Sequence, residues 1–322
     1  MKTTRYVSGI IMLLLAAFFW GTTFIAQSDA MQKMGPFTFS ALRSVIGAVF
    51  LVFVILLRKL MSRKQPLFQG SMKATVKGGI VCGTALFIAT NLQNIGLIGA
   101  APGKAAFITS LYILFVPIIG IFSGNRPSKT VLVCVLVSVT GFYMLNMRPE
   151  EGFGLTVWEI MVLLCALAFS MHIIFCDKYG RNGDTVLLSM IQFAVCALLS
   201  GIFIFADTLV LDYPVISFAI LKEGWFSIIY AGLLSSGVAF TLQISGQKRV
   251  PAAAAVLLMS LESLFAVISA YIIAPESNAL TAVQTVGCAL IFISVCVSQL
   301  SFPKRNKCVA CKTPESAEGD HK

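Results

Sequence analysis

The side chains best suited to chemistry lie inside long apolar stretches of the sequence. Glu262 stands about 11 residues into the stretch 251–274, roughly 16 Å along a helix and near the middle of a bilayer core about 30 Å thick. A carboxylate at that depth costs at least about 2.5 kcal/mol, so it must face a wet cavity, pair with a donor or hold a proton. We therefore predict that Glu262 binds a solute or carries a coupling proton. A carboxyl group hydrogen-bonded between helices is the structural alternative.

Arg43 and His172 also interrupt apolar stretches. Arg43 lies about six residues into the stretch 37–57, so its guanidinium can pair with a substrate carboxylate or extend along its own stem to the membrane surface. His172 can titrate near neutral pH, or it can sit as a neutral ring between helices. Both residues are candidates for binding or coupling.

Aromatic and amide side chains complete the candidate set. Tyr112 lies near the middle of its predicted span, where it can stack on a solute or pack with its hydroxyl satisfied. Trp20 suits either a cavity wall or an interface between helices. Amides within apolar spans more often hydrogen-bond between helices than contact a ligand, and the three predicted to reach a cavity are Gln93, Gln192 and Gln243.

Composition identifies the elements that must position these side chains. The chain has 322 residues, of which 57% are hydrophobic and 12% charged, whereas soluble proteins average about 45–50% and about 25%. At about 20 residues per span, we predict an all-α integral membrane protein with ten transmembrane helices, near residues 7–27, 37–57, 76–96, 103–122, 130–147, 158–176, 186–205, 225–245, 251–274 and 281–302.

The basic residues predict how these spans are oriented. Cytoplasmic loops of membrane proteins carry an excess of lysine and arginine. With ten spans and a cytoplasmic N-terminus, 19 of the 24 basic residues fall on the inner side, four fall on the outer side, and Arg43 lies within a span. We therefore predict a multi-pass protein of the bacterial plasma membrane with both termini in the cytoplasm. The net charge of +10 reflects this distribution and does not indicate binding to nucleic acid.

The sequence also matches itself at an offset near 150 residues. The matches that carry weight are Leu92-Gln93 and Gly96 with Leu242-Gln243 and Gly246, and Ser110-Leu111 and Phe115 with Ser260-Leu261 and Phe265. Each repeat holds five spans, and an odd number means that the second repeat enters the membrane from the opposite side. Inverted repeats of this kind are typical of secondary transporters, with the substrate site at the repeat interface.

Three segments resemble the EamA family of the drug/metabolite transporter superfamily. They are WGTTF at 20–24, GAAPGKAAFITSLYILFVPIIGIF at 99–122 and GLLSSGVAFTLQISGQKRVPAAAAVLLMSLESLFAVISAYI at 232–272. The resemblance implies a ten-helix basket that moves amino acids, other metabolites or drugs, commonly outward. The family usually has proline after the glutamate of span nine, and Ser263 at that position argues against a kink there.

These observations divide the chain into five parts. We predict a cytoplasmic N-terminus (1–6), a first EamA repeat (7–147), an outer linker (148–157), a second EamA repeat (158–302) and a disordered cytoplasmic tail (303–322). Cys308 and Cys311 form a lone CxxC in that tail, without the second half that a zinc site needs. We expect no cofactor and no metal.

The function predicted from the sequence is secondary transport. No P-loop, HExxH or GxSxG motif is present, which argues against a nucleotide-driven motor and an enzyme. We predict a protein in the lipid bilayer that exports small metabolites such as amino acids by alternating access between its two repeats. Its coupling partner would be a proton or a counter-substrate. A passive channel or facilitator with a polar lumen is the alternative.

Overall fold

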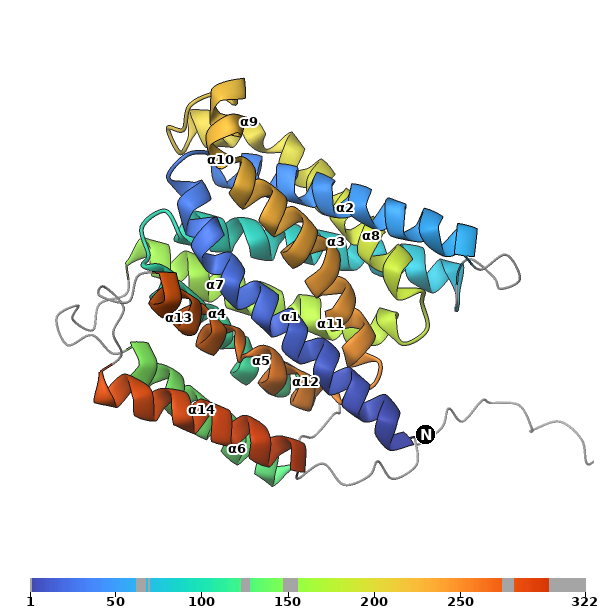
Figure 1. Cartoon of the computed structure of the whole chain (residues 1–322), viewed down its shortest axis with the longest axis vertical. Coiled ribbons are helices and arrows are strands. Elements are labelled where there is room, and N and C mark those ends of the chain that lie inside the picture. The colour runs from blue at the N-terminus through green and yellow to red at the C-terminus, as the bar shows by residue number, and fades with distance from the viewer. Residues whose placement is uncertain are drawn as a thin grey trace, which may run out of the picture.

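A computed structural model describes residues 2–61, 68, 70–122, 128–146, 156–273 and 281–300, and all regular secondary structure in these ranges is helical. Figure 1 shows the arrangement. In chain order the helices are α1 (Lys2–Met31), α2 (Pro36–Met61), α3 (Met72–Gly96), α4 (Pro102–Ser110), α5 (Tyr112–Phe122), α6 (Lys129–Asn146), α7 (Val157–Gly180), α8 (Thr185–Ile202), α9 (Ile204–Leu209), α10 (Phe218–Tyr230), the π-helix η2 (Ala231–Ala239), α11 (Phe240–Gln247), α12 (Ala252–Met259), α13 (Glu262–Ile273) and α14 (Ala282–Leu300).

Eight helical stretches among the described residues are long and apolar enough to cross a membrane. They are Thr4–Met31, Pro36–Met61, Met72–Gly96, Pro102–Phe122, Val157–Gly180, Thr185–Ile202, Phe218–Gln247 and Ala252–Ile273, and two shorter apolar helices cover Lys129–Met144 and Ala282–Ser298. The prediction of an all-α, multi-pass membrane protein is confirmed. The ten-helix count and the inverted repeat stay predictions. Most of the predicted linker 148–157 and the whole tail 303–322, with its CxxC, lie outside the described residues.

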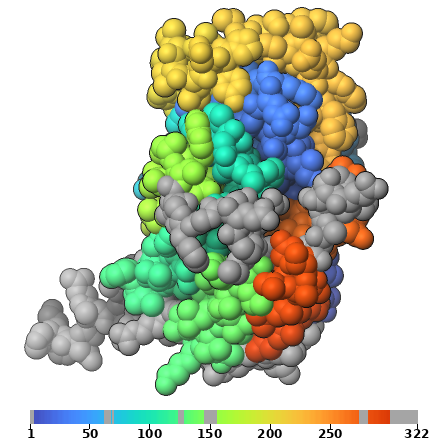
Figure 2. All heavy atoms as spheres, turned by 90° about the vertical axis from the view of Figure 1, so that its left-hand side faces the viewer, coloured from blue at the N-terminus to red at the C-terminus, as the bar shows by residue number. Residues whose placement is uncertain are grey.

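Helices distant in sequence pack along one another. α3 lies against α7 and α8, α2 lies against α8 and η2, and α1 crosses the bundle against α11 and α13 (Figure 1). α6 and α14 pair at one edge, and α9 and α10 lie at the opposite edge (Figure 2). Large apolar side chains such as Val49, Phe53 and Leu136 are exposed on the outside of the bundle, where a bilayer would cover them.

Polar contacts concentrate at the ends of the long helices. The guanidinium of Arg58, at the end of α2, donates to the Asp184 carboxylate, which also caps the start of α8. At the other end of α2, the buried Asp207 carboxylate accepts hydrogen bonds from the backbone N–H groups of Phe37 and Thr38 at 3.1 and 2.7 Å. An acidic group at a helix N-terminus is stabilised by the free N–H groups and by the helix dipole. These contacts hold α2 to the α8–α9 region at both ends.

Two of the membrane-crossing stretches are interrupted near their middles. α4 ends at Ser110 and α5 begins at Tyr112, while α12 ends at Met259 and α13 begins at Glu262. The second interruption lies beside Ser263, the position at which the sequence left a kink in doubt. Ser260 Oγ donates to the carbonyl of Leu257, and Ser263 Oγ donates to the carbonyl of Ala106 in α4.

Candidate functional site

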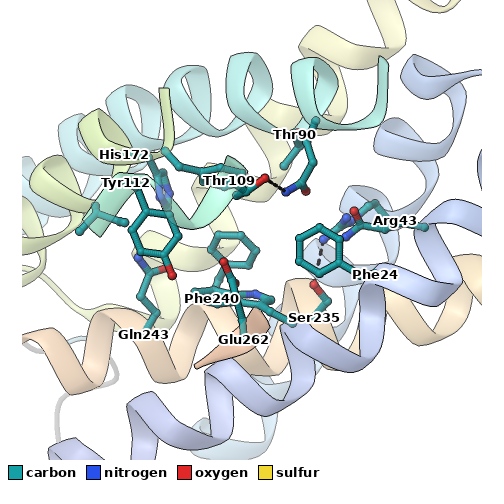
Figure 3. A pocket seen from close by; sticks show the side chains of 15 residues that line it. Phe24, Arg43, Thr90, Thr109, Tyr112, His172, Ser235, Phe240, Gln243 and Glu262 are labelled. Atoms are coloured by element: carbon teal, nitrogen blue, oxygen red, sulfur yellow. Dashed lines mark hydrogen bonds between the residues drawn. The ribbon is translucent and has the colours of Figure 1, made fainter. Parts of the chain in front are cut away.

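The first residues after the two interruptions face a common cavity. Tyr112 begins α5 and Glu262 begins α13, and Figure 3 shows the Tyr112 ring and the Glu262 carboxyl group on neighbouring walls. The cavity has a volume of about 40 Å³. At about 10–15 Å³ for one water, this space holds roughly three waters. An amino acid needs more room than this, so the cavity in this conformation is too small to hold one.

Seven of the eight predicted site residues line this cavity, and they come from seven different helices. The seven are Trp20, Arg43, Gln93, Tyr112, His172, Gln243 and Glu262. The eighth, Gln192, is fully buried behind the wall, where its Oε1 atom lies 3.1 Å from Nε2 of His172. The structure therefore brings together residues that are up to 242 positions apart in the sequence.

Glu262 occupies a position suited to a carboxylate. It is 5% exposed and stands in the first turn of α13, where the helix dipole favours negative charge. Its Oε1 atom has no hydrogen-bond partner among the described residues. The Tyr112 hydroxyl lies beside the Glu262 carboxyl group and interacts with it, although no hydrogen bond of good geometry joins the two groups. This pair can therefore receive a polar group of a ligand, or a water.

Arg43 points into the protein and not toward the membrane surface. It is 3% exposed, and its guanidinium lies 5.7 Å from the centre of the Phe39 ring. Its Nε and Nη2 atoms donate to the hydroxyls of Ser236 and Ser235 at 3.2 and 2.9 Å. In Figure 3, Arg43 and Ser235 lie on the opposite side of Glu262 from Tyr112 and Gln243. The cavity thus carries a cationic group at one end, apart from its carboxyl group.

His172 is part of a buried hydrogen-bonded cluster. Its Nε2 atom lies 3.4 Å from Cys176 Sγ, and that sulfur lies 3.7 Å from Cys82 Sγ. The ring also stacks edge-on against Phe240. These contacts support the interpretation of His172 as a satisfied histidine that shapes the wall. In the part of the chain that the structure describes, no group of three or more histidine, cysteine and acidic side chains is arranged to hold a metal ion.

The sequence analysis missed about half of the cavity wall. The additional lining residues are Phe24, Gln27, Thr90, Thr109, Phe169, Ile173, Ser235 and Phe240. Thr109 holds the side chain of Gln93, whose Nε2 atom donates to its hydroxyl at 3.2 Å. Ser235 and Ser236 form a polar pair in the apolar run GLLSSGVAF. This pair is a signal in the sequence that could have been used to predict hydrogen-bond partners for Arg43.

Unsatisfied polar atoms gather around the cavity. Among the described residues, ten buried side-chain nitrogen or oxygen atoms lack a hydrogen-bond partner, and five of them belong to lining residues: Trp20 Nε1, Gln27 Oε1, Tyr112 Oη, Gln243 Oε1 and Glu262 Oε1. Buried polar groups are nearly always hydrogen-bonded, to protein or to water. A few convergent polar groups on an otherwise apolar wall are typical of a site for a small molecule.

Salt bridges and hydrogen bonds also join helices outside the cavity lining. At the end of the bundle bearing the α3–α4 turn, Lys104 Nζ lies 2.6 Å from Glu159 Oε1, at the start of α7. At the other end, Lys248 Nζ donates to the carbonyl of Gly183 at 2.6 Å, and Arg249 donates to Ser8 of α1 at 2.8 Å. The contacts of Lys104 and Arg249 join the N-terminal half of the chain to the C-terminal half, and the contact of Lys248 joins two segments of the C-terminal half.

Comparisons with known proteins agree with these observations. The model of the EamA-like transporter family matches residues 7–147 and again residues 156–299. An uncharacterized transporter of Archaeoglobus fulgidus is 28% identical over 89% of this chain and 84% of its own length. The uncharacterized transporter YoaV of Bacillus subtilis is 27% identical over 74% of this chain and 78% of its own. A solved crystal structure shares the fold with a TM-score of 0.70, at 21% identity, over 91% of this chain and 97% of its own. The chain belongs to the EamA-like transporter family.

Proposed function

We propose that this protein is a secondary transporter that works by alternating access. The observation that carries the proposal is the small polar cavity, whose wall includes the first residues of two interrupted helices, Tyr112 and Glu262. Interrupted helices that line a central site are typical of secondary transporters. The family match and the transporter relatives support the same class and argue against an enzyme.

The packing of the helices supports two inverted five-helix repeats, 7–147 and 158–302. α1 packs against α11, α12 and α13, and its counterpart at the 150-residue offset, α7, packs against α3, α4 and α5. α2 pairs with its counterpart α8, and α6 pairs with α14, where the hydroxyls of Ser138 and Ser294 meet. Two halves that exchange equivalent contacts can adopt two packings of similar energy, one open to each side.

The proposed substrate is a small metabolite such as an amino acid, and the proposed direction is export across a bacterial plasma membrane. Both chain termini would lie in the cytoplasm. Glu262, Tyr112, Arg43, Gln93, Gln243 and Trp20 would contact the substrate or a coupling proton, and His172 with Gln192 would shape the wall. A counter-substrate is the alternative coupling partner. In this scheme the Lys104–Glu159 salt bridge breaks when the cavity opens outward.

Flux through proteoliposomes tests this proposal. We expect the purified protein to release preloaded, radiolabelled amino acids from liposomes at rates that saturate with concentration. The control is liposomes of the same lipid without protein. An imposed pH gradient should change the rate for a proton-coupled carrier and leave it unchanged for an exchanger. Failure to move any solute of a broad metabolite panel faster than the empty liposomes contradicts the proposal.

A further inference from the structure

We propose that Arg43, Ser235 and Ser236 form a binding site for a carboxylate group of the transported solute. This inference rests on the proposed transport function and extends it, because it assigns one chemical group of the substrate to one end of the cavity. Arg43 comes from α2, and both serines come from η2. The site is separate from the Glu262–Tyr112 end of the same cavity (Figure 3).

The first support is the charge of Arg43, which the protein leaves without an anionic partner. Among the described residues, the salt bridges join Asp29, Asp177, Asp184 and Glu159 to other cations, and no carboxylate lies within 4.0 Å of the Arg43 guanidinium. Its hydrogen-bond partners are neutral hydroxyls, and Nη1 has no hydrogen bond within the described part of the chain. A buried charge without a counter-charge is unfavourable. An incoming anion would remove that cost.

The second support is the local geometry of η2. A nine-residue π-helix, Ala231–Ala239, interrupts an otherwise α-helical stretch. π-helical turns are rare and occur frequently at functional sites. The wider turn places the consecutive hydroxyls of Ser235 and Ser236 on the same guanidinium. α2 also approaches η2 closely, because a Cβ atom on Gly47 would lie 2.8 Å from Ser236 Cβ. The guanidinium is therefore held in one orientation before a ligand arrives.

The third support comes from the other half of the chain. At the 150-residue offset, Arg43 corresponds to Phe193, and Ser235 and Ser236 correspond to Ala85 and Leu86. Phe193 and Leu86 belong to one buried apolar cluster. The contact between α8 and α3, which corresponds to that between α2 and η2, is thus formed by apolar side chains, as suits packing alone. The charged version in the opposite half therefore indicates binding.

The chemistry of the site favours a carboxylate. A guanidinium presents several N–H groups in one plane, which matches the two oxygens of a carboxylate in a bidentate pair. A single cation with two neutral hydroxyls balances one negative charge, and a phosphate dianion would leave a second charge buried. The polar atoms of Tyr112 and Glu262 at the far end of the cavity can hydrogen-bond a second polar group of the same solute.

Thermal stabilisation of the purified full-length protein tests the site independently of flux. The probes are the common α-amino acids, each measured beside its own carboxamide, which keeps the shape and removes the anion. We expect some amino acids to raise the unfolding temperature at concentrations about tenfold or more below those that their carboxamides require. Arg43→Gln should abolish this difference. Arg43→Lys, which keeps the charge and loses the planar fork, should retain part of it.

The matched control is Arg58→Gln, which removes an arginine from the same helix at its salt bridge with Asp184, outside the cavity. It should leave the preference for carboxylates unchanged. Equal stabilisation by acid and carboxamide, or a preference that persists in Arg43→Gln, overturns the carboxylate site even if proteoliposome flux is normal. Wild-type protein that no carboxylate stabilises overturns it as well. If Arg43→Gln does not fold, Arg43→Lys tests the proposal instead. A preference for the acid over the carboxamide that is as large in Arg43→Lys as in the wild type contradicts bidentate binding by the guanidinium.

Discussion

Glu262→Gln should remove the response of transport to a pH gradient and lower gradient-driven flux by about tenfold or more. Glu262 is the carboxyl group that lines the cavity, and it is 5% exposed at the first turn of α13. Glutamine has nearly the same shape and can still hydrogen-bond, but it cannot release a proton. The measurement compares flux of the best substrate into proteoliposomes with and without an imposed pH gradient.

The matched control is Glu223→Gln, which changes an exposed glutamate on α10 that does not line the cavity. Its flux should respond to the pH gradient as the wild-type flux does. Flux that still responds to the pH gradient in Glu262→Gln would exclude a proton-carrying role for this residue. A wild-type flux that ignores the gradient would favour exchange with a counter-substrate.

Gly21→Ala should lower the stability of the protein by about 1–3 kcal/mol, the usual range for overpacking a close contact. Gly21 lies where α1 crosses α13. A Cβ atom there would lie 2.5 Å from the carbonyl oxygen of Glu262 and 2.8 Å from the backbone nitrogen of Ala266. Backbone atoms cannot move aside as the end of a flexible side chain can. We expect a lower unfolding temperature in detergent and slower transport, since the start of α13 carries Glu262.

Gly201→Ala is the control for this substitution. Gly201 lies near the end of α8, and a Cβ atom there would meet nothing within 4 Å. Alanine is a better helix former than glycine by about 1 kcal/mol, so this variant should be as stable as the wild type or slightly more so. An unchanged unfolding temperature in Gly21→Ala would show that α1 and α13 do not pack as closely as described.

The fold class could be predicted from the sequence because a bilayer imposes one simple requirement. Each span needs about 20 apolar residues, and such runs are visible without any knowledge of tertiary contacts. Seven of the eight candidate residues line one cavity, and the bilayer explains this too. Ionisable and amide side chains are costly in lipid, so those that occur within spans tend to face the interior of the bundle. Trp20 and Tyr112 line the same cavity.

Other features depend on contacts between distant segments, and the sequence could not reveal them. The direction of Arg43 is set by Ser235 and Ser236, almost 200 positions away in the chain. The interruption before Glu262 lies beside serine hydroxyls that donate to the carbonyls of Leu257 and Ala106, with no proline to signal it. The nine-residue π-helix likewise packs closely against α2, a contact that the local sequence does not reveal.

Counterflow tests the central claim, alternating access, most directly. Proteoliposomes are loaded with a high concentration of the unlabelled best substrate, without a pH gradient, and diluted into a low concentration of the labelled form. A carrier whose cavity opens to one side at a time should accumulate label inside transiently, above its outside concentration. A channel lets labelled and unlabelled molecules equilibrate independently. Label that never exceeds the outside concentration would contradict the proposed mechanism.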